Sequence, residues 1–175
     1  GTFAEKNLKN QPTLGFVGLG VMGKPMCLNL ARKASSKIIG FDLSSNPLDR
    51  LAGDGVERGR SLSELARKCG IVFLCLPDGK AVATVSMSSG GLISQMEENS
   101  ILVDMSTSPV DLPESIAALC RENKIFFADA PVARTREAAI QGHLSIMVGS
   151  THSLFERLLP FLKHIGTEVT RCGEV

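Results

Sequence analysis

The sequence lacks several features that would indicate particular classes of protein. Its 175 residues contain no Trp and no Tyr, and no apolar run is long enough to span a bilayer. Basic and acidic residues nearly balance, at 19 and 18, so no broad positive surface for nucleic acid is expected. The polar start of the chain, residues 1–13, has no signal-peptide core, which indicates a cytoplasmic protein or a trimmed chain. We therefore expect neither a nucleic-acid partner nor a membrane partner.

Clustered metal ligands are also missing. The five cysteines are an odd number and are scattered along the chain without a Cys-x-x-Cys pair. His143, His152 and His164 are equally dispersed. Because metal sites need clustered ligands, the sequence predicts reduced, mostly buried thiols and no metal site.

The most informative segment that is present runs from Leu14 to Gly23. A short apolar run stops at Gly18-x-Gly20-x-x-Gly23 and continues into a sequence typical of a helix. Gly18 allows a tight turn out of a strand, Gly20 lets the backbone approach a pyrophosphate, and Gly23 lets the helix pack closely on the sheet. With 17 glycines in the chain, about 0.2 such matches arise by chance, so the surrounding sequence has to decide.

Strand-like and helix-like segments alternate along the whole chain. Apolar runs predict strands at 14–18, 37–41, 71–76, 101–104, 125–129, 144–149 and 168–172. Helical patterns predict helices at 21–33, 47–51, 61–68, 80–85, 112–122, 135–141 and 153–163. The strands are continuously apolar without a two-residue alternation, which indicates a parallel sheet covered by helices on both faces. We expect one α/β domain over residues 14–175, preceded by an extension, residues 1–13, that is disordered or left over from expression.

The loops that follow the strands are the candidate site, because ligands of open parallel sheets bind at the carboxyl ends of strands. Asp42 ends the second predicted strand, about twenty residues after the glycines. A carboxylate there accepts both ribose hydroxyls of an adenosine and repels a 2′-phosphate. Leu43 and two serines follow, whereas NADP would favour an Arg. NAD is therefore predicted over NADP, and the alternative for Asp42 is a solvated loop acid.

Three later loops carry further candidates. Leu76 is the last residue of the third apolar run and Pro77 follows it, where the proline either borders a ligand or only ends the strand. Ser106 and Thr107 follow the fourth, where their hydroxyls either face a ligand or cap the next helix. The loop 129–135 follows the fifth run.

These segments together resemble the β-hydroxyacid dehydrogenases, the 3-hydroxyisobutyrate dehydrogenase-like enzymes. The resembling motifs occur in family order at 16–30, 74–79, 104–109 and 129–149. The resemblance implies a Rossmann-type doubly wound cofactor domain, then an all-helical domain through which subunits pair. It also implies reversible oxidation of a short hydroxy acid, with hydride passing to a nicotinamide. The 6-phosphogluconate dehydrogenases are similar, but an Asn-Arg-Thr-like NADP sequence usually stands there in place of Phe41-Asp42-Leu43.

The resemblance assigns roles to individual residues. Ser106 would bind the carboxylate of the substrate. The implied cofactor contacts are Gly18, Leu19, Gly20, Val21, Met22, Gly23, Asp42, Leu76, Pro77, Ala81 and Thr107.

One departure from the family pattern concerns the substrate. The family usually has Gly-Gly soon after Asp-Ala-Pro-Val, whereas this chain has Ala-Arg134-Thr135, as reductases of sulfonated aldehydes in the family do. A guanidinium offers a bidentate donor fork for a carboxylate, sulfonate or phosphate. We expect Arg134 and Thr135, with Ser106, to bind an acidic small molecule. The alternative is an exposed Arg134 that pairs with Glu137 or Glu114.

A second departure concerns catalysis. Family members continue into a long helix with a catalytic Lys, the expected general acid/base, and no Lys up to Val175 stands in that context. The resemblance therefore implies no catalytic residue within this chain, whose helical domain is absent, with Lys80 as the alternative. It implies a homo-oligomer when that domain is present.

The function predicted from these features is that of a cofactor domain. The intact enzyme would be an NAD-dependent dehydrogenase or reductase of a short hydroxy acid or its aldehyde or keto form, such as 3-hydroxyisobutyrate, tartronate semialdehyde or sulfolactaldehyde. The fragment alone would be inactive. The alternatives are a non-catalytic NAD(P)-binding assembly or sensing module, and a flavin or nucleotide-sugar enzyme that has only the glycine loop in common.

Overall fold

The computed structural model describes residues 11–44, 51–133 and 136–175. The expected short helix from Pro47 and most of the expected N-terminal extension lie outside these ranges, so both stay predictions. Thr13, the last residue of that extension, accepts a hydrogen bond from the Gly70 backbone N–H at 3.0 Å. The main chain is therefore tied to the fold one residue before the first strand begins.

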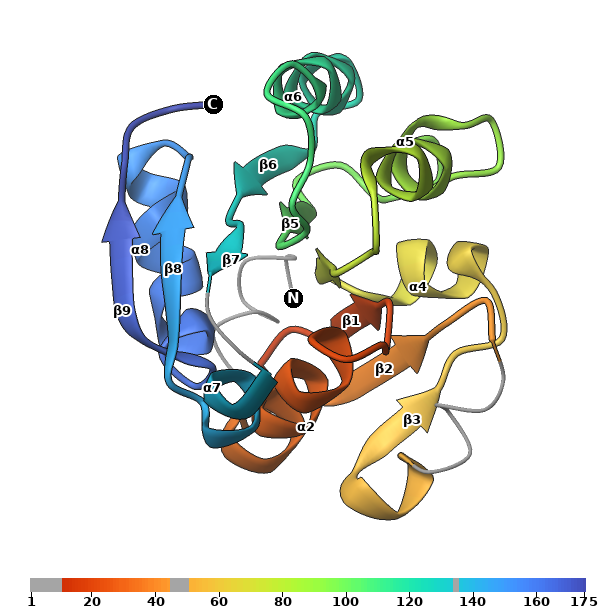
Figure 1. Ribbon diagram of the computed structural model, residues 1–175. Helices are drawn as coiled ribbons and strands as arrows, with labels where there is room; N and C mark the ends of the chain where they lie inside the picture. Colours follow the sequence, from red (N-terminus) through yellow and green to blue (C-terminus); the bar gives the residue numbers. More distant parts are fainter. Residues whose placement is uncertain (1–10, 45–50, 134–135) are drawn as a thin grey trace.

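A six-stranded parallel sheet forms the centre of the fold (Figure 1). Its strands are β1 (Leu14–Val17), β2 (Ile38–Phe41), β3 (Val56–Arg58), β4 (Ile71–Leu74), β5 (Ile101–Asp104) and β6 (Phe126–Asp129). Their order in the sheet is β3-β2-β1-β4-β5-β6, and every neighbouring pair is parallel. The chain thus moves outward from β1 to β3 and then returns to place β4 on the other side of β1. This reversal between β1 and β4 is where open α/β sheets bind ligands.

Helices cover both faces of this sheet. They are α2 (Gly23–Lys33), α4 (Leu62–Lys68), α5 (Gly79–Met87), α6 (Leu112–Glu122), α7 (Arg136–Gln141) and α8 (His152–Leu162), with one 3₁₀ turn, η1 (Ala52–Asp54). In Figure 1, α4, α5 and α6 lie on one side of the sheet, and α2 and α8 lie on the other. Ser61 begins α4 as its sequence predicts, because its side chain accepts a hydrogen bond from the Glu64 N–H at 3.1 Å. The Rossmann-type, doubly wound architecture is confirmed.

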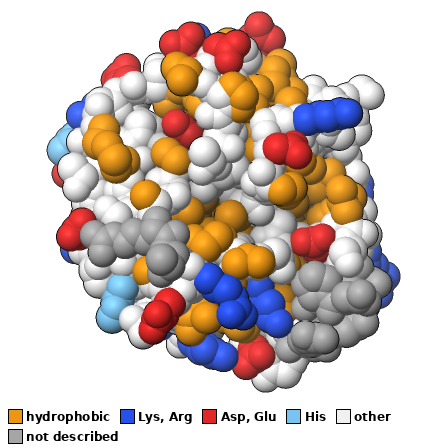
Figure 2. Space-filling model, viewed as in Figure 1, with side chains coloured by type: hydrophobic (Ala, Val, Ile, Leu, Met, Phe, Trp, Pro, Cys, Tyr) orange, Lys and Arg blue, Asp and Glu red, His pale blue; other side chains and the backbone are white. Residues whose placement is uncertain are grey.

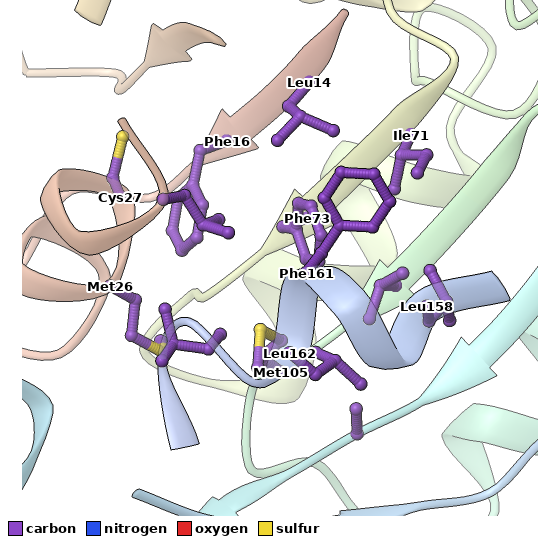
Figure 3. Packing of buried hydrophobic residues seen from close by; sticks show 14 of the residues in the cluster. Leu14, Phe16, Met26, Cys27, Ile71, Phe73, Met105, Leu158, Phe161 and Leu162 are labelled. Carbon is purple, nitrogen blue, oxygen red and sulfur yellow. The ribbon is translucent and has the colours of Figure 1, made fainter. Parts of the chain in front are cut away.

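Two apolar cores result, one on each face of the sheet. Phe16 of β1 and Phe73 of β4 stack with their ring centroids 6.0 Å apart. Figure 3 shows this pair beside Phe161 and Leu162 of α8. The rings of Phe16 and Phe73 are fully buried. The opposite faces of the same strands pack under α4, α5 and α6. Because both faces are covered, the strands have no polar alternation.

The last three strands form a separate sheet, although the sequence indicated a single parallel sheet. These strands are β7 (Val132–Ala133), β8 (Leu144–Val148) and β9 (Gly166–Arg171), in the order β7-β8-β9. β7 pairs with β8 antiparallel, β8 pairs with β9 parallel, and a bridge between Asp129 and Gly149 joins the two sheets. In the described part of the chain, no helix is both long and apolar enough to cross a membrane.

Candidate cofactor-binding site

The glycine loop after β1 is shaped by two steric constraints. Gly18 has φ +98°, and a Cβ placed on it would lie 2.0 Å from the carbonyl oxygen of Cys75. A Cβ on Gly23 would lie 1.9 Å from the carbonyl oxygen of Gly18. Both positions therefore need glycine, because the loops after β1 and β4 and the start of α2 approach too closely for a side chain.

Gly20 differs, because it borders open space. A Cβ there would meet no atom within 4 Å. Across the described residues, no acceptor takes the backbone N–H of Gly20, Val21 or Met22, while the Lys24 N–H donates to the Gly20 carbonyl at 3.0 Å. The first turn of α2 thus presents free donors and its positive dipole end beside an open space. This arrangement fits a pyrophosphate.

Asp42 is joined to that loop at the end of β2. Its Oδ2 accepts a hydrogen bond from the Leu19 N–H at 2.7 Å, and its Oδ1 accepts one from the Ser44 N–H at 2.9 Å. Asp42 is therefore not a freely solvated acid. Each carboxylate oxygen keeps a second lone pair, so the same group can also accept from ribose hydroxyls.

The loops after β4 and β5 are joined in the same way. The Ser106 Oγ accepts a hydrogen bond from the Leu76 N–H at 2.8 Å. A Cβ on Gly79 would lie 2.7 Å from Cδ of Pro109, so the two loops also pack closely. Ser106 is 3 % exposed, whereas Thr107 is exposed. Neither caps α6, whose N-cap residue is Asp111.

Asp78, to which the sequence assigned no role, caps α5. Its Oδ1 accepts a hydrogen bond from the Ala81 N–H at 2.8 Å. The backbone donor of Ala81 is therefore already used, which leaves its half-buried side chain for any contact with a cofactor. Pro77 stands exposed at the same edge.

Two carboxyl groups lie side by side at the ends of β5 and β6. Asp104 and Asp129 are register partners, so their side chains leave the same face of the sheet. Burial raises the pKa of Asp104, and the hydrogen bond that the Ser106 backbone N–H donates to this carboxylate partly opposes the rise. Burial, followed by the charge of Asp104, raises the pKa of Asp129 from 3.8 to about 6. Burial also raises the pKa of the nearby Cys75 thiol to about 12, which makes it a poor nucleophile at neutral pH.

Arg134 and Thr135, the predicted substrate ligands, lie outside the described residues. The structure does show how the following helix, α7, is fixed. The Asn29 Nδ2 of α2 donates to the carbonyl oxygens of Ala139 at 2.9 Å and Ile140 at 3.2 Å. Asn29 is 5 % exposed, and the sequence had given no role to it.

The described site residues thus form two linked pairs at one edge of the sheet. The glycine loop is bonded to Asp42, and the Leu76 loop is bonded to Ser106. Within the described ranges, no group of three or more His, Cys, Asp or Glu side chains could hold a metal ion. On the face shown in Figure 2, acidic and basic side chains are interspersed, apart from a small basic group near the lower centre.

Fold and site together define a dinucleotide-binding Rossmann domain. Residues 13–173 match the family model described as the NAD binding domain of 6-phosphogluconate dehydrogenase. The chain is 32% identical over 170 residues to 2-(hydroxymethyl)glutarate dehydrogenase of Eubacterium barkeri, covering 97% of this chain and 55% of that protein.

Two solved structures show the same architecture. The 3-hydroxyisobutyrate dehydrogenase of Mycobacterium tuberculosis with L-serine has a TM-score of 0.86 at 29% identity, over 94% of this chain and 55% of that one. Psf3 in complex with NADP+ and 2-OPP has a TM-score of 0.87 at 26% identity, over 92% and 57%.

The chain therefore belongs to the 6-phosphogluconate dehydrogenase-type NAD-binding domains, among the 3-hydroxyisobutyrate dehydrogenase-like β-hydroxyacid dehydrogenases. The resemblance found in the sequence is confirmed, and the cofactor class is NAD(P). The chain spans about half the length of the curated relatives it matches, such as 55% of the Eubacterium barkeri enzyme.

Proposed function

We propose that this chain is the cofactor domain of an NAD-dependent dehydrogenase or reductase that interconverts a short hydroxy acid and its aldehyde or keto form. The observation that carries the proposal is the bond from the Leu19 N–H to the Asp42 carboxylate. Through this bond the Asp42 carboxylate lies beside the loop whose Gly20 borders open space, where it would accept hydrogen bonds from the adenosine ribose. A 2′-phosphate would meet the negative charge of Asp42, which favours NAD over NADP.

The residues present fit the dinucleotide. The free N–H groups of Gly20, Val21 and Met22 would bind its pyrophosphate, and Asp42 would bind the adenosine ribose. Leu76, Pro77, Ala81 and Thr107 would border the nicotinamide side. When bound, the nicotinamide supplies the hydride donor or acceptor of the reaction. The proton for the carbonyl oxygen would come from a Lys outside residues 1–175.

Binding of the cofactor can be tested on the chain itself. We expect NADH to bind at least about tenfold more tightly than NADPH, since one repulsive contact of about 1.4 kcal/mol gives that ratio. Turnover of hydroxy acids by the 175 residues should be negligible. Equal affinity for the two dinucleotides would contradict the assignment of NAD, and measurable turnover would contradict a catalytic Lys outside the chain.

The substrate would be an acid held by Ser106, Arg134 and Thr135. Two similar enzymes, the 2-(hydroxymethyl)glutarate and 3-hydroxyisobutyrate dehydrogenases, are both named after a carboxylic acid. Subunit pairing through a helical domain would complete the enzyme.

Arg134→Ala in the full-length enzyme tests this pocket. Loss of a charge-assisted bidentate contact should raise KM for the acid about 10- to 100-fold and leave KM for NAD unchanged. Arg136→Ala, at the exposed first residue of α7, is the matched control. Carboxylated, sulfonated and phosphorylated three- and four-carbon alcohols would identify the acid. An unchanged KM for the best substrate would remove Arg134 from the pocket.

A further inference from the structure

Asp104 is a buried carboxyl group that the proposed cofactor contacts do not include. It ends β5 and is 0 % exposed. Its Oδ1 accepts a hydrogen bond from the Ser106 N–H at 2.9 Å. This bond fixes the turn by which the chain leaves β5, and that turn determines where the Ser106 side chain points.

Ser106 transmits this constraint to the neighbouring loop. Its Oγ accepts from the Leu76 N–H at 2.8 Å, which ties the residue after β5 to the residue before Pro77. The two hydrogen bonds that connect Asp104, Ser106 and Leu76 therefore link the ends of two strands. Thr107, the exposed residue of the same turn, is placed by the same bonds.

The surroundings of Asp104 do not explain the carboxyl group as an ion-pair partner. Among the residues that the structure describes, no Lys, Arg or His forms an ion pair with it. Within the described ranges, the titratable groups that interact electrostatically with it are Asp129 of β6 and Cys75 after β4, and neither is a cation. Its Oδ2 is buried without a hydrogen bond, and so is the nearby Ser108 Oγ. A buried acid without a cation costs stability, so packing alone would favour an apolar side chain here.

We propose that Asp104 is a positioning residue for the nicotinamide side of the site, which it orders through Ser106 and the Leu76 loop. This rests on the proposed placement of the nicotinamide beside Leu76, Pro77 and Thr107. The adenosine side depends on a different carboxylate, Asp42, which bonds to the loop after β1. Loss of Asp104 should therefore weaken only the contacts of the nicotinamide half.

Two ligands separate the halves of the cofactor. NADH occupies both sides of the site, whereas ADP-ribose has the adenosine, the pyrophosphate and the second ribose but no nicotinamide. We expect Asp104→Ala to weaken NADH binding about tenfold, because the loss of one or two oriented hydrogen bonds lowers affinity by about that factor. The same variant should change ADP-ribose binding less than about twofold. Asp104→Asn keeps an acceptor for the Ser106 N–H and should retain NADH affinity.

Two further variants complete the experiment. Ile101→Ala, at the other end of the same strand, removes a buried side chain and leaves the Ser106 turn untouched, so it controls for general destabilisation. Ser106→Ala removes the acceptor for the Leu76 N–H and should reproduce the NADH-selective loss even where Asp104→Ala does not fold. Binding is measured by titration, and folding by the thermal midpoint of each variant.

The possible outcomes are distinct. A wild-type chain that binds neither ligand would overturn the proposed cofactor site itself. A wild-type chain that binds both, with equal losses for NADH and ADP-ribose in Asp104→Ala and in Ile101→Ala, would reduce Asp104 to a structural residue. An Asp104→Asn variant as weak as Asp104→Ala would overturn the hydrogen-bond relay. A loss confined to NADH and rescued by Asn supports it.

Discussion

Gly20→Ala separates cofactor binding from folding. A Cβ at this position meets no protein atom within 4 Å, and Gly20 is not among the glycines with positive φ. The folded chain therefore accepts the methyl group, and the lower entropy of the unfolded chain should stabilise the domain by about 0.4–1 kcal/mol. The same methyl group would stand where the pyrophosphate approaches the N–H groups of Val21 and Met22. Loss of one charge-assisted hydrogen bond lowers affinity about 10- to 100-fold.

Gly18→Ala, two residues earlier, should do the opposite. Its Cβ would lie 2.0 Å from the Cys75 carbonyl oxygen, and its φ of +98° is unfavourable for an L-residue. The conformation costs about 1–2 kcal/mol, and forcing a methyl group into a packed contact costs about 1–3 kcal/mol. We therefore expect the free energy of unfolding to fall by about 2–5 kcal/mol. Any loss of NADH affinity would then follow from a distorted fold.

The assay is urea unfolding together with NADH titration on the same samples. Gly53→Ala is the matched control, because Gly53 also borders open space but lies in η1, away from the glycine loop. It should change neither the affinity nor, by more than about 1 kcal/mol, the stability. Full NADH affinity in Gly20→Ala would refute the placement of the pyrophosphate at this loop. Strong destabilisation of Gly20→Ala would refute the steric argument.

Two further predictions concern carboxylates. Asp42→Ala should lower the free energy of unfolding by about 1–3 kcal/mol, because the Leu19 and Ser44 N–H groups lose their acceptor. It should also reduce the preference for NADH over NADPH, and an unchanged ratio of the two dissociation constants would contradict this. For Asp129, the pKa rises from 3.8 in the unfolded chain to about 6 in the folded one, so the folded state binds more protons between these values. Stability should therefore fall as pH rises through this window and level off above it, by about 1–2 kcal/mol after allowing for partial solvent screening. Asp129→Asn should remove this fall in urea unfolding series, and a wild-type curve parallel to that of the variant would show the reasoning to be wrong.

The fold was most predictable where a strand is covered on both faces. All four residues of β4 are buried, so its apolar run identifies it directly. β3 was missed because only Val56 of its three residues is buried, and this edge strand forms through pairing with β2. Its existence depends on a neighbour and not on its own pattern.

The separate second sheet could not be predicted because of one side chain in β8. In β8, Leu144, Ile146 and Val148 are buried, whereas Met147 is 58 % exposed. Its burial therefore alternates as in a sheet with one covered face. Because Met147 is itself apolar, the sequence resembles a strand buried on both faces. Composition alone could not separate the two cases.

The geometry of the candidate site was predictable where spacing along the chain determines it, as for the close approach at Gly18, the open space at Gly20 and the position of Asp42 at the end of β2. Asp104 and Asn29 were not assigned roles, because their environments are made by distant segments. Burial of Asp104 depends on its register partner in β6 and on the turn that follows β5. Asn29 binds the end of a helix that lies 110 residues later in the sequence. Local pattern carries no information on either contact.

The hydrogen bonds of the site have a symmetry about the reversal between β1 and β4. On one side, a carboxylate at the end of β2 binds the loop after β1. On the other, a hydroxyl after β5 binds the loop after β4. At the centre, Gly18 and Cys75 approach so closely that no Cβ fits. Each loop is thus fixed by its outer neighbour and by contact with the other loop. The opening that we propose for the dinucleotide is therefore shaped by contacts within the protein, and less ordering entropy would oppose binding there.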